Sequence, residues 1–230
     1  MRTYWSCWLR ATLRSVGFAV WAACGALLFL AGYYLDVLAL DAPARRLPAM
    51  GVAAAEAVAW SAAIVRGAAP TLGEDLEQLL EPSRLGPNGT FLARWTGAWL
   101  TGVLACLPCL LIVVVLSQYI GHIDCLKQLI IALASAAAGG ALLSAWVVGA
   151  RPWLGSASAA LLALAVWTLG PMVSTGPFPS LVPASAAVPS IERAGLVAGE
   201  ALAAVGLALV GAALARGTFA GARGTARDAA

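Results

Sequence analysis

The segment WTGAWLTGVLACLPCLLIVVVL, residues 95–116, contains no charged side chain. An α-helix rises 1.5 Å per residue, so about 20 apolar residues cross the roughly 30 Å hydrocarbon core of a bilayer. Backbone groups in hydrocarbon must be hydrogen-bonded within the protein, and a helix satisfies them inside one segment. The segment therefore predicts a transmembrane helix and an all-α integral membrane fold.

The composition of the whole chain supports the same class. Of 230 residues, 61% are hydrophobic and only 11% are charged, and the mean hydropathy is +0.87. Such a chain has too few polar groups to cover a soluble globule. The net charge of +3 comes from basic residues that are spread thinly, so we do not expect nucleic-acid binding.

Apolar runs predict six transmembrane helices in one permease domain that covers residues 1–230. The second run is rich in Ala and contains Glu56, so a re-entrant or interfacial segment is the alternative there. The predicted spans are about 15–35, 47–65, 95–116, 128–149, 153–175 and 194–215.

The distribution of basic residues predicts the orientation. With both termini in the cytoplasm, ten basic residues fall inside and four outside, which agrees with the positive-inside rule. The first run has full spanning length, so we expect a retained helix rather than a cleaved signal peptide. A bacterial inner membrane is the expected location, with a mitochondrial inner membrane as the alternative. The inner set is Arg2, Arg10, Arg14, Arg66, Arg84, Arg94, Arg151, Arg216, Arg223 and Arg227; the outer set is Arg45, Arg46, Lys127 and Arg193.

An acidic amphipathic helix is predicted over about 71–85, between the second and third spans. Thr71 and Glu74 form a capping box, and Pro82 ends the helix. Four leucines form one apolar stripe, while the acids lie mostly off it. Because cytoplasmic lipid surfaces are negative, this helix suits a basic groove on a partner protein; a solvated connecting helix is the alternative. The expected docking residues are Leu72, Glu74, Asp75, Leu76, Glu77, Gln78, Leu79, Leu80, Glu81 and Arg84.

Two carboxylates fall inside predicted spans, Glu56 near the midplane and Glu200 nearer the outer surface. A charge in hydrocarbon costs about 2.5–3.5 kcal/mol on insertion scales, so each must face a partner, a cavity or a proton. The alternatives are a protonated side chain bonded to a neighbouring helix, favoured for Glu200, or part of a substrate or coupling path.

Other chemistry-bearing residues give weaker signals. Cys106 and Cys109 have CxxC spacing, but their position inside a span indicates apolar packing rather than redox or metal chemistry. His122 is the only histidine, with Asp124 and Cys125 nearby, and one histidine is a poor metal site, so we expect no metal. The chain has no GxxxxGK[ST] sequence and should not bind ATP through a P-loop.

The order of these elements resembles the ABC-2 type permeases, in which a cytoplasmic coupling helix follows the second span and docks on a separate ATPase. GEDLEQLLEPSR followed by FLARWTGAWL carries this resemblance. Within that superfamily the chain is similar to the CcmB family, the membrane subunit of the haem exporter of cytochrome c maturation. That similarity rests on RRLPAMGVAAAEAVAW leading to DLEQLL, on Leu107-Pro108, on Gly121 and on WVVGARPWLGSASAALLAL.

The resemblance implies a non-catalytic subunit that couples ATP hydrolysis on a CcmA-like partner to release of a haem-loaded chaperone. CcmC-like and CcmD-like membrane partners, and two copies around the ATPase dimer, are implied as well. ATP and haem would then bind to partner chains, and no cofactor to this one. The alternatives are another ABC-2 exporter, a NosY-like maturation permease, or an ATP-independent scaffold or proton-linked carrier that uses Glu56.

Overall fold

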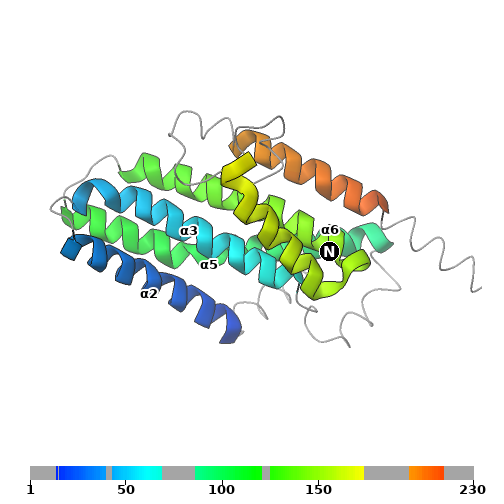
Figure 1. The fold of residues 1–230 in the computed structure, drawn as a ribbon, viewed down its shortest axis with the longest axis horizontal. Coiled ribbons are helices and arrows are strands. Elements are labelled where there is room, and N and C mark those ends of the chain that lie inside the picture. Colours follow the sequence, from blue (N-terminus) through cyan, green and yellow to red (C-terminus); the bar gives the residue numbers. More distant parts are fainter. Residues whose placement is uncertain are drawn as a thin grey trace, which may run out of the picture.

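The chain is all-helical in the part that the computed structural model describes, namely residues 14, 16–39, 43–68, 86–120, 125–173 and 197–214. Helix α2 spans Val16–Ala39, α3 Pro43–Ala68, α5 Gly86–Ile120 and α6 Cys125–Val173. A C-terminal helix covers Val197–Leu214 and is orange in Figure 1. The expected all-α class is confirmed for these residues.

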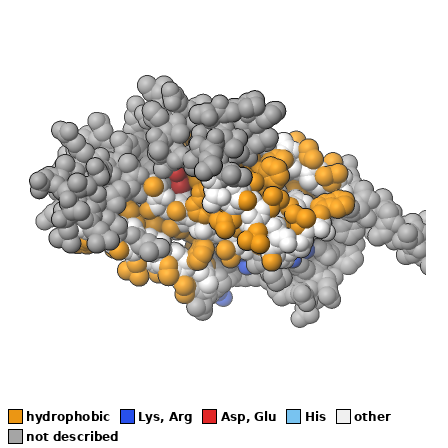
Figure 2. Space-filling model, in the orientation of Figure 1, with side chains coloured by type: hydrophobic (Ala, Val, Ile, Leu, Met, Phe, Trp, Pro, Cys, Tyr) orange, Lys and Arg blue, Asp and Glu red, His pale blue; other side chains and the backbone are white. Residues whose placement is uncertain are grey.

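Three of the described helical stretches are long and apolar enough to cross a membrane: Gly89–Leu116, Ala132–Thr168 and Val197–Leu214. Hydrophobic side chains dominate the described surface in Figure 2, as expected where lipid replaces water as the solvent. The chain is accordingly a helical membrane protein. The predicted span 47–65 lies inside α3, which is not among the three.

Helix α3 packs along α6 with the two helices parallel. Trp60 lies against Gly139, and Gly67 lies against Val147, so rising residue numbers on one helix meet rising numbers on the other. A Cβ atom at Gly139 would stand 2.6 Å from the Trp60 ring, so only glycine leaves room for the indole there. Small side chains let membrane helices approach closely, which is how they gain packing energy without a hydrophobic driving force.

Helix α5 runs antiparallel to both of these helices. Val113 packs against Gly51, whereas Gly102, earlier in α5, meets Ala59, later in α3. Two tryptophans join α5 to α6: Trp95 Nε1 donates to the carbonyl oxygen of Ala141 at 2.9 Å, and Trp99 Nε1 donates to that of Ala137 at 2.8 Å. Their rings stack with centroids 6.3 Å apart. Helix α2 in turn packs on α3, with Gly25 against Val58.

Helix α6 is broken at Gly155, where φ is +78° and ψ is 170°. This left-handed φ is accessible to glycine at no steric cost. After the break the chain turns back across α3 (Figure 1), and Ala159 and Ala163 join the same buried cluster as Val147. The sequence predicts separate helices over 128–149 and 153–175; the structure keeps Arg151 and Pro152 helical and places the break a few residues later.

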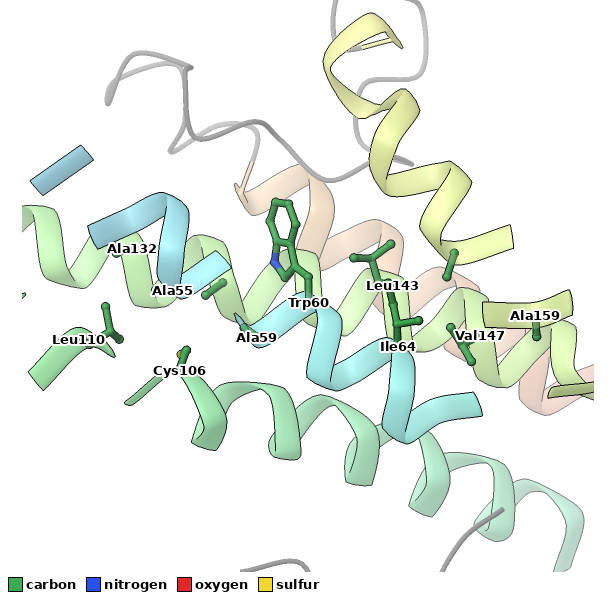
Figure 3. Packing of buried hydrophobic residues seen from close by; sticks show 12 residues of the cluster. Ala55, Ala59, Trp60, Ile64, Cys106, Leu110, Ala132, Leu143, Val147 and Ala159 are labelled. Atoms are coloured by element: carbon green, nitrogen blue, oxygen red, sulfur yellow. The ribbon is translucent and has the colours of Figure 1, made fainter. Parts of the chain in front are cut away.

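The buried core lies where α3, α5 and both parts of α6 meet (Figure 3). Most of its members are small, so the helix backbones approach each other directly. The C-terminal helix adds a peripheral layer, because Ala208 and Ala212 pack on Phe91 and Val148. The fully enclosed members of the central cluster are Ala55, Ala59, Trp60, Ile64, Cys106, Leu110, Ala132, Ala136, Leu143, Val147, Ala159 and Ala163.

Arginines of four segments lie at one end of the bundle. The end of α3 meets Val147 and Val148 of α6, and Phe91 near the start of α5 packs on Val148. Phe29 of α2 packs beside Ala54, so α2 runs antiparallel to α3 and begins at the same end. This end, called the arginine end below, carries Arg14, Arg66, Arg94 and Arg151. Arg45, Arg46 and Lys127 belong to the opposite helix ends.

We predict that Gly102→Ala destabilises the bundle. The added methyl group would collide with the carbonyl oxygen of Ala59, so α3 and α5 would have to separate. Overpacking of this kind costs about 1–3 kcal/mol, partly offset by the better helix propensity of alanine. The midpoint of SDS-induced unfolding in mixed micelles, followed by far-UV circular dichroism, measures the effect.

Gly149→Ala is the matched control, since Gly149 is also helical and nothing lies within 4 Å of the place that its added methyl group would take. It should be neutral or slightly stabilising. Equal unfolding midpoints for the two variants would contradict the close approach of α3 to α5.

Candidate functional site

Glu56 and Ser135 form a polar pair in the core of the bundle. Glu56 projects from α3 and is 3% exposed, and Ser135 on α6 is fully buried. The Ser135 hydroxyl donates to Glu56 Oε1 at 2.5 Å. This bond joins residues 79 positions apart, so it is a tertiary contact that no local pattern in the sequence specifies.

Small side chains next to Glu56 and Ser135 allow the two helices to approach closely enough for this hydrogen bond. Ala55 and Ala59 flank Glu56 on α3, and Ala132 and Ala136 flank Ser135 on α6; all four are buried in the central cluster. Because these side chains end at Cβ, the two backbones come close enough for a serine hydroxyl to reach a carboxyl group. The alanine content of α3 is therefore what allows it to hold Glu56.

The pair lies near the middle of the membrane helices. Cys106 of α5 packs in the same cluster as Ala55, and it falls inside the apolar stretch Gly89–Leu116. At that depth protein atoms rather than lipid surround the carboxyl group, which lowers the cost of burying it. Oxygen Oε1 can accept the serine hydrogen bond in either the ionised or the protonated state.

Two tryptophan rings pack together in the core, and one of them lies one helical turn from the pair. Trp60 follows Glu56 by four residues and is 3% exposed, and its ring meets Trp167 edge-on with centroids 5.7 Å apart. Its indole nitrogen has no hydrogen-bond acceptor among the described residues. A buried N–H group without an acceptor costs free energy, so the packing of the Trp60 ring must outweigh that cost.

Glu200 is also fully buried, near the start of the C-terminal helix. Ala204, one turn later, packs with Leu142 of α6. Glu200 therefore lies one helical turn before the level of Leu142. Both carboxyl groups are thus enclosed by protein, and the position of Glu200 nearer the outer membrane surface stays a prediction.

The two candidate cysteines of α5 lie in packed surroundings. Cys106 belongs to the central cluster and Cys109 packs with Phe29 and Val113; both are free thiols. Within the described helices no three His, Cys, Asp or Glu residues are close enough to share a metal ion. His122 and Asp124 lie outside the described residues, as does the side chain of Cys125.

The predicted docking element at 71–85 also lies outside the described residues. Its two attachment points are described, however. Helix α3 ends at Ala68 and α5 begins at Gly86, and both belong to the arginine end of the bundle. The link between these helices therefore leaves and re-enters the bundle on the side where arginines gather.

A groove of about 430 Å³, which the sequence pattern did not predict, lies between α2, α3 and the second part of α6. Trp21 and Phe29 of α2 and Trp167 of α6 form its walls. Ala53, Ala57 and Ser61, at intervals of four residues on α3, are among the residues of its floor. This i, i+4 series of small residues is the sequence signal that could have indicated a shallow face on α3.

Comparisons with known proteins add no relatives: no family model, curated protein or solved structure matches the chain. The candidate site therefore rests on its own geometry.

We predict that Ser135→Ala destabilises the bundle by about 1–3 kcal/mol, because it leaves a buried carboxyl oxygen without its donor. Ser144→Ala is the control: Ser144 is equally buried on α6, but its hydroxyl donates to Ala141 of its own helix. Thermal unfolding in detergent measures both. A loss for Ser135→Ala no larger than that for Ser144→Ala would show that the pair contributes no tertiary stability.

Proposed function

We propose that this chain is the membrane subunit of an ABC-2 type transport complex, similar to CcmB. The observation that carries the proposal is that the acidic amphipathic segment 71–85 is attached to the arginine end of the bundle. Under the positive-inside rule that end faces the cytoplasm, where a partner ATPase would bind. Both chain termini would face the same side.

The chemistry of the segment favours a protein partner. Glu74, Asp75, Glu77 and Glu81 lie within eight positions, next to a stripe of leucines. The cytoplasmic leaflet is negative and attracts basic helices, so an acidic face gains nothing from lipid headgroups. A basic groove on an ATPase subunit would complement the acids and cover the leucines.

The described packing offers a path by which movement at this segment would reach the membrane. Its ends continue into α3 and α5, which are in backbone contact at Gly102 and Ala59. Helix α3 is in turn joined to α6 through the pair of Glu56 and Ser135. Close-packed interfaces shift between discrete arrangements rather than deform smoothly, so a displacement of α3 and α5 would be passed to α6.

In this proposal the chain transmits energy and does not carry out the chemistry itself. ATP would be hydrolysed on a CcmA-like subunit, and haem would be held by CcmC-like and CcmD-like partners in a bacterial inner membrane. Two copies of the chain would pair around the ATPase dimer. A NosY-like maturation permease or another ABC-2 exporter would use the same docking arrangement with a different cargo.

We predict that the tagged chain, purified from its native membrane, retains a P-loop ATPase subunit. Leu76→Asp combined with Leu79→Asp should reduce the retained ATPase at least tenfold, because charges would replace the apolar stripe that docking buries. Quantitative mass spectrometry of the eluate, normalised to the tagged chain, measures the ratio.

The matched control is Asn88→Asp, which adds an acid next to segment 71–85 at a position outside the expected docking residues. It should retain the ATPase. The docking proposal fails if no P-loop ATPase is recovered with the wild-type chain, or if the double variant retains as much as the control.

The buried pair favours a second candidate function, an ATP-independent scaffold or a carrier coupled to protons through Glu56. Its supporting observation is a carboxyl group at mid-membrane depth that is hydrogen-bonded to a neighbouring helix. Intramembrane carboxylates of this kind mark proton paths in many transporters. This function would require Glu56 to exchange a proton and would not require segment 71–85.

Glu56→Gln separates the two functions. The amide keeps an oxygen that can accept from Ser135 but cannot titrate. If the chain is an ABC-2 subunit of cytochrome c maturation, Glu56→Gln should support covalent haem attachment in a strain lacking the wild-type gene, measured by haem staining of c-type cytochromes. Complete loss of haem attachment, with normal protein level and ATPase retention, would favour the proton-linked role.

A further inference from the structure

The turn between the two parts of α6 carries exposed apolar side chains. At Gly155 the chain turns back, so the residues just before it form the tip of a helical hairpin (Figure 1). Pro152, Trp153, Leu154 and Gly155 are all exposed, and the exposed fractions of Trp153 and Leu154 are 66% and 50%. Large apolar side chains that stay exposed together mark a contact with a membrane or with another protein.

The neighbouring helix α5 gives the depth of this tip. Val148 of α6 packs with Phe91 of α5, and the two helices are antiparallel, so residues after Val148 lie level with residues before Phe91. The apolar stretch of α5 begins at Gly89, about 3 Å beyond that contact. Trp153 lies five residues, or about 7–8 Å, beyond the same contact. The tip is therefore about 4–5 Å past the end of the apolar stretch.

This position coincides with the lipid headgroup layer. A bilayer measures about 30 Å across its hydrocarbon core and about 40–45 Å with its headgroups, which leaves about 5–8 Å for the headgroup layer on each side. A soluble partner would have to enter this layer to cover the tip, whereas lipid already occupies it. The depth thus favours a lipid contact over a protein contact.

The residue types at the tip suit the same layer. Tryptophan is enriched at membrane interfaces, because its ring is apolar and its N–H group is polar. Arg151, two residues before Trp153, adds the kind of cation that suits phosphate oxygens. None of the described residues at the arginine end is acidic, so the charge of this end complements phosphate headgroups.

We propose that the turn over residues 151–155 is an interfacial anchor, in which Trp153 and Leu154 lie among the lipid headgroups of the leaflet at the arginine end. The anchor holds the hairpin tip at a fixed depth. Because the second part of α6 leaves from this tip and packs on the core through Ala159 and Ala163, the anchor also fixes the point from which that part crosses α3.

Photo-crosslinking in the native membrane tests the contact. The photoreactive residue p-benzoylphenylalanine replaces Trp153 in the chain, and peptides from the irradiated membrane are analysed by mass spectrometry. We expect a phospholipid adduct at position 153. The same replacement of Trp60 is the matched control and should give no lipid adduct, since Trp60 is a tryptophan that is only 3% exposed.

Fluorescence quenching by brominated lipids measures the depth. The wild-type chain and Trp153→Phe are reconstituted into vesicles whose lipids carry bromine either near the headgroup or near the methyl end of the acyl chain. The difference in emission between the two proteins isolates Trp153. We expect its emission to be quenched more by bromine near the headgroup.

Three outcomes would overturn the proposal. A crosslink from position 153 to a protein, without a phospholipid adduct, would show that the tip is a protein contact. Stronger quenching by bromine at the methyl end would place Trp153 in the hydrocarbon core, and no quenching by either lipid would place it in water. Neither measurement depends on the ATPase partner, so the outcome is independent of the proposed transport function.

Discussion

The close approach of α3 to its neighbours is the constraint on which the rest of the structure depends. Glycine and alanine at the crossing points bring the α3 backbone against α5 at Gly102 and against α6 at Gly139. Lipid provides no hydrophobic force between helices, so the bundle is held by this packing and by a few polar contacts. The other described helices pack against α3, α5 or α6.

The same constraint explains how an acidic residue can occupy the centre of the bundle. Alanine flanks let Ser135 reach Glu56, and the surrounding helices keep lipid away from the carboxyl group. On its outer side, the small residues of α3 leave a hollow that α2 and Trp167 border but do not fill. One helix thus contributes both to the buried polar pair and to the floor of the groove.

The sequence predicted the helical class and the membrane setting well, and the candidate site only in part. Glu56 could be singled out, because a carboxyl group in an apolar run is conspicuous. Its partner could not, because Ser135 is 79 residues away and resembles many other serines in apolar helices. The break in α6 lies a few residues later than the boundary that the sequence predicts, because Gly155 is the residue that takes a positive φ, which glycine adopts without steric cost.

By itself the sequence determined that the described chain is helical and suited to a bilayer, because hydropathy and backbone hydrogen bonding act within each segment. It also determined the basic and acidic segments that predict orientation and docking. Only the tertiary structure decided which arginines share one end, which buried acid meets which hydroxyl, and where the bundle leaves a groove. Those features depend on helix register and crossing, which are set by the shapes of side chains far apart in the sequence.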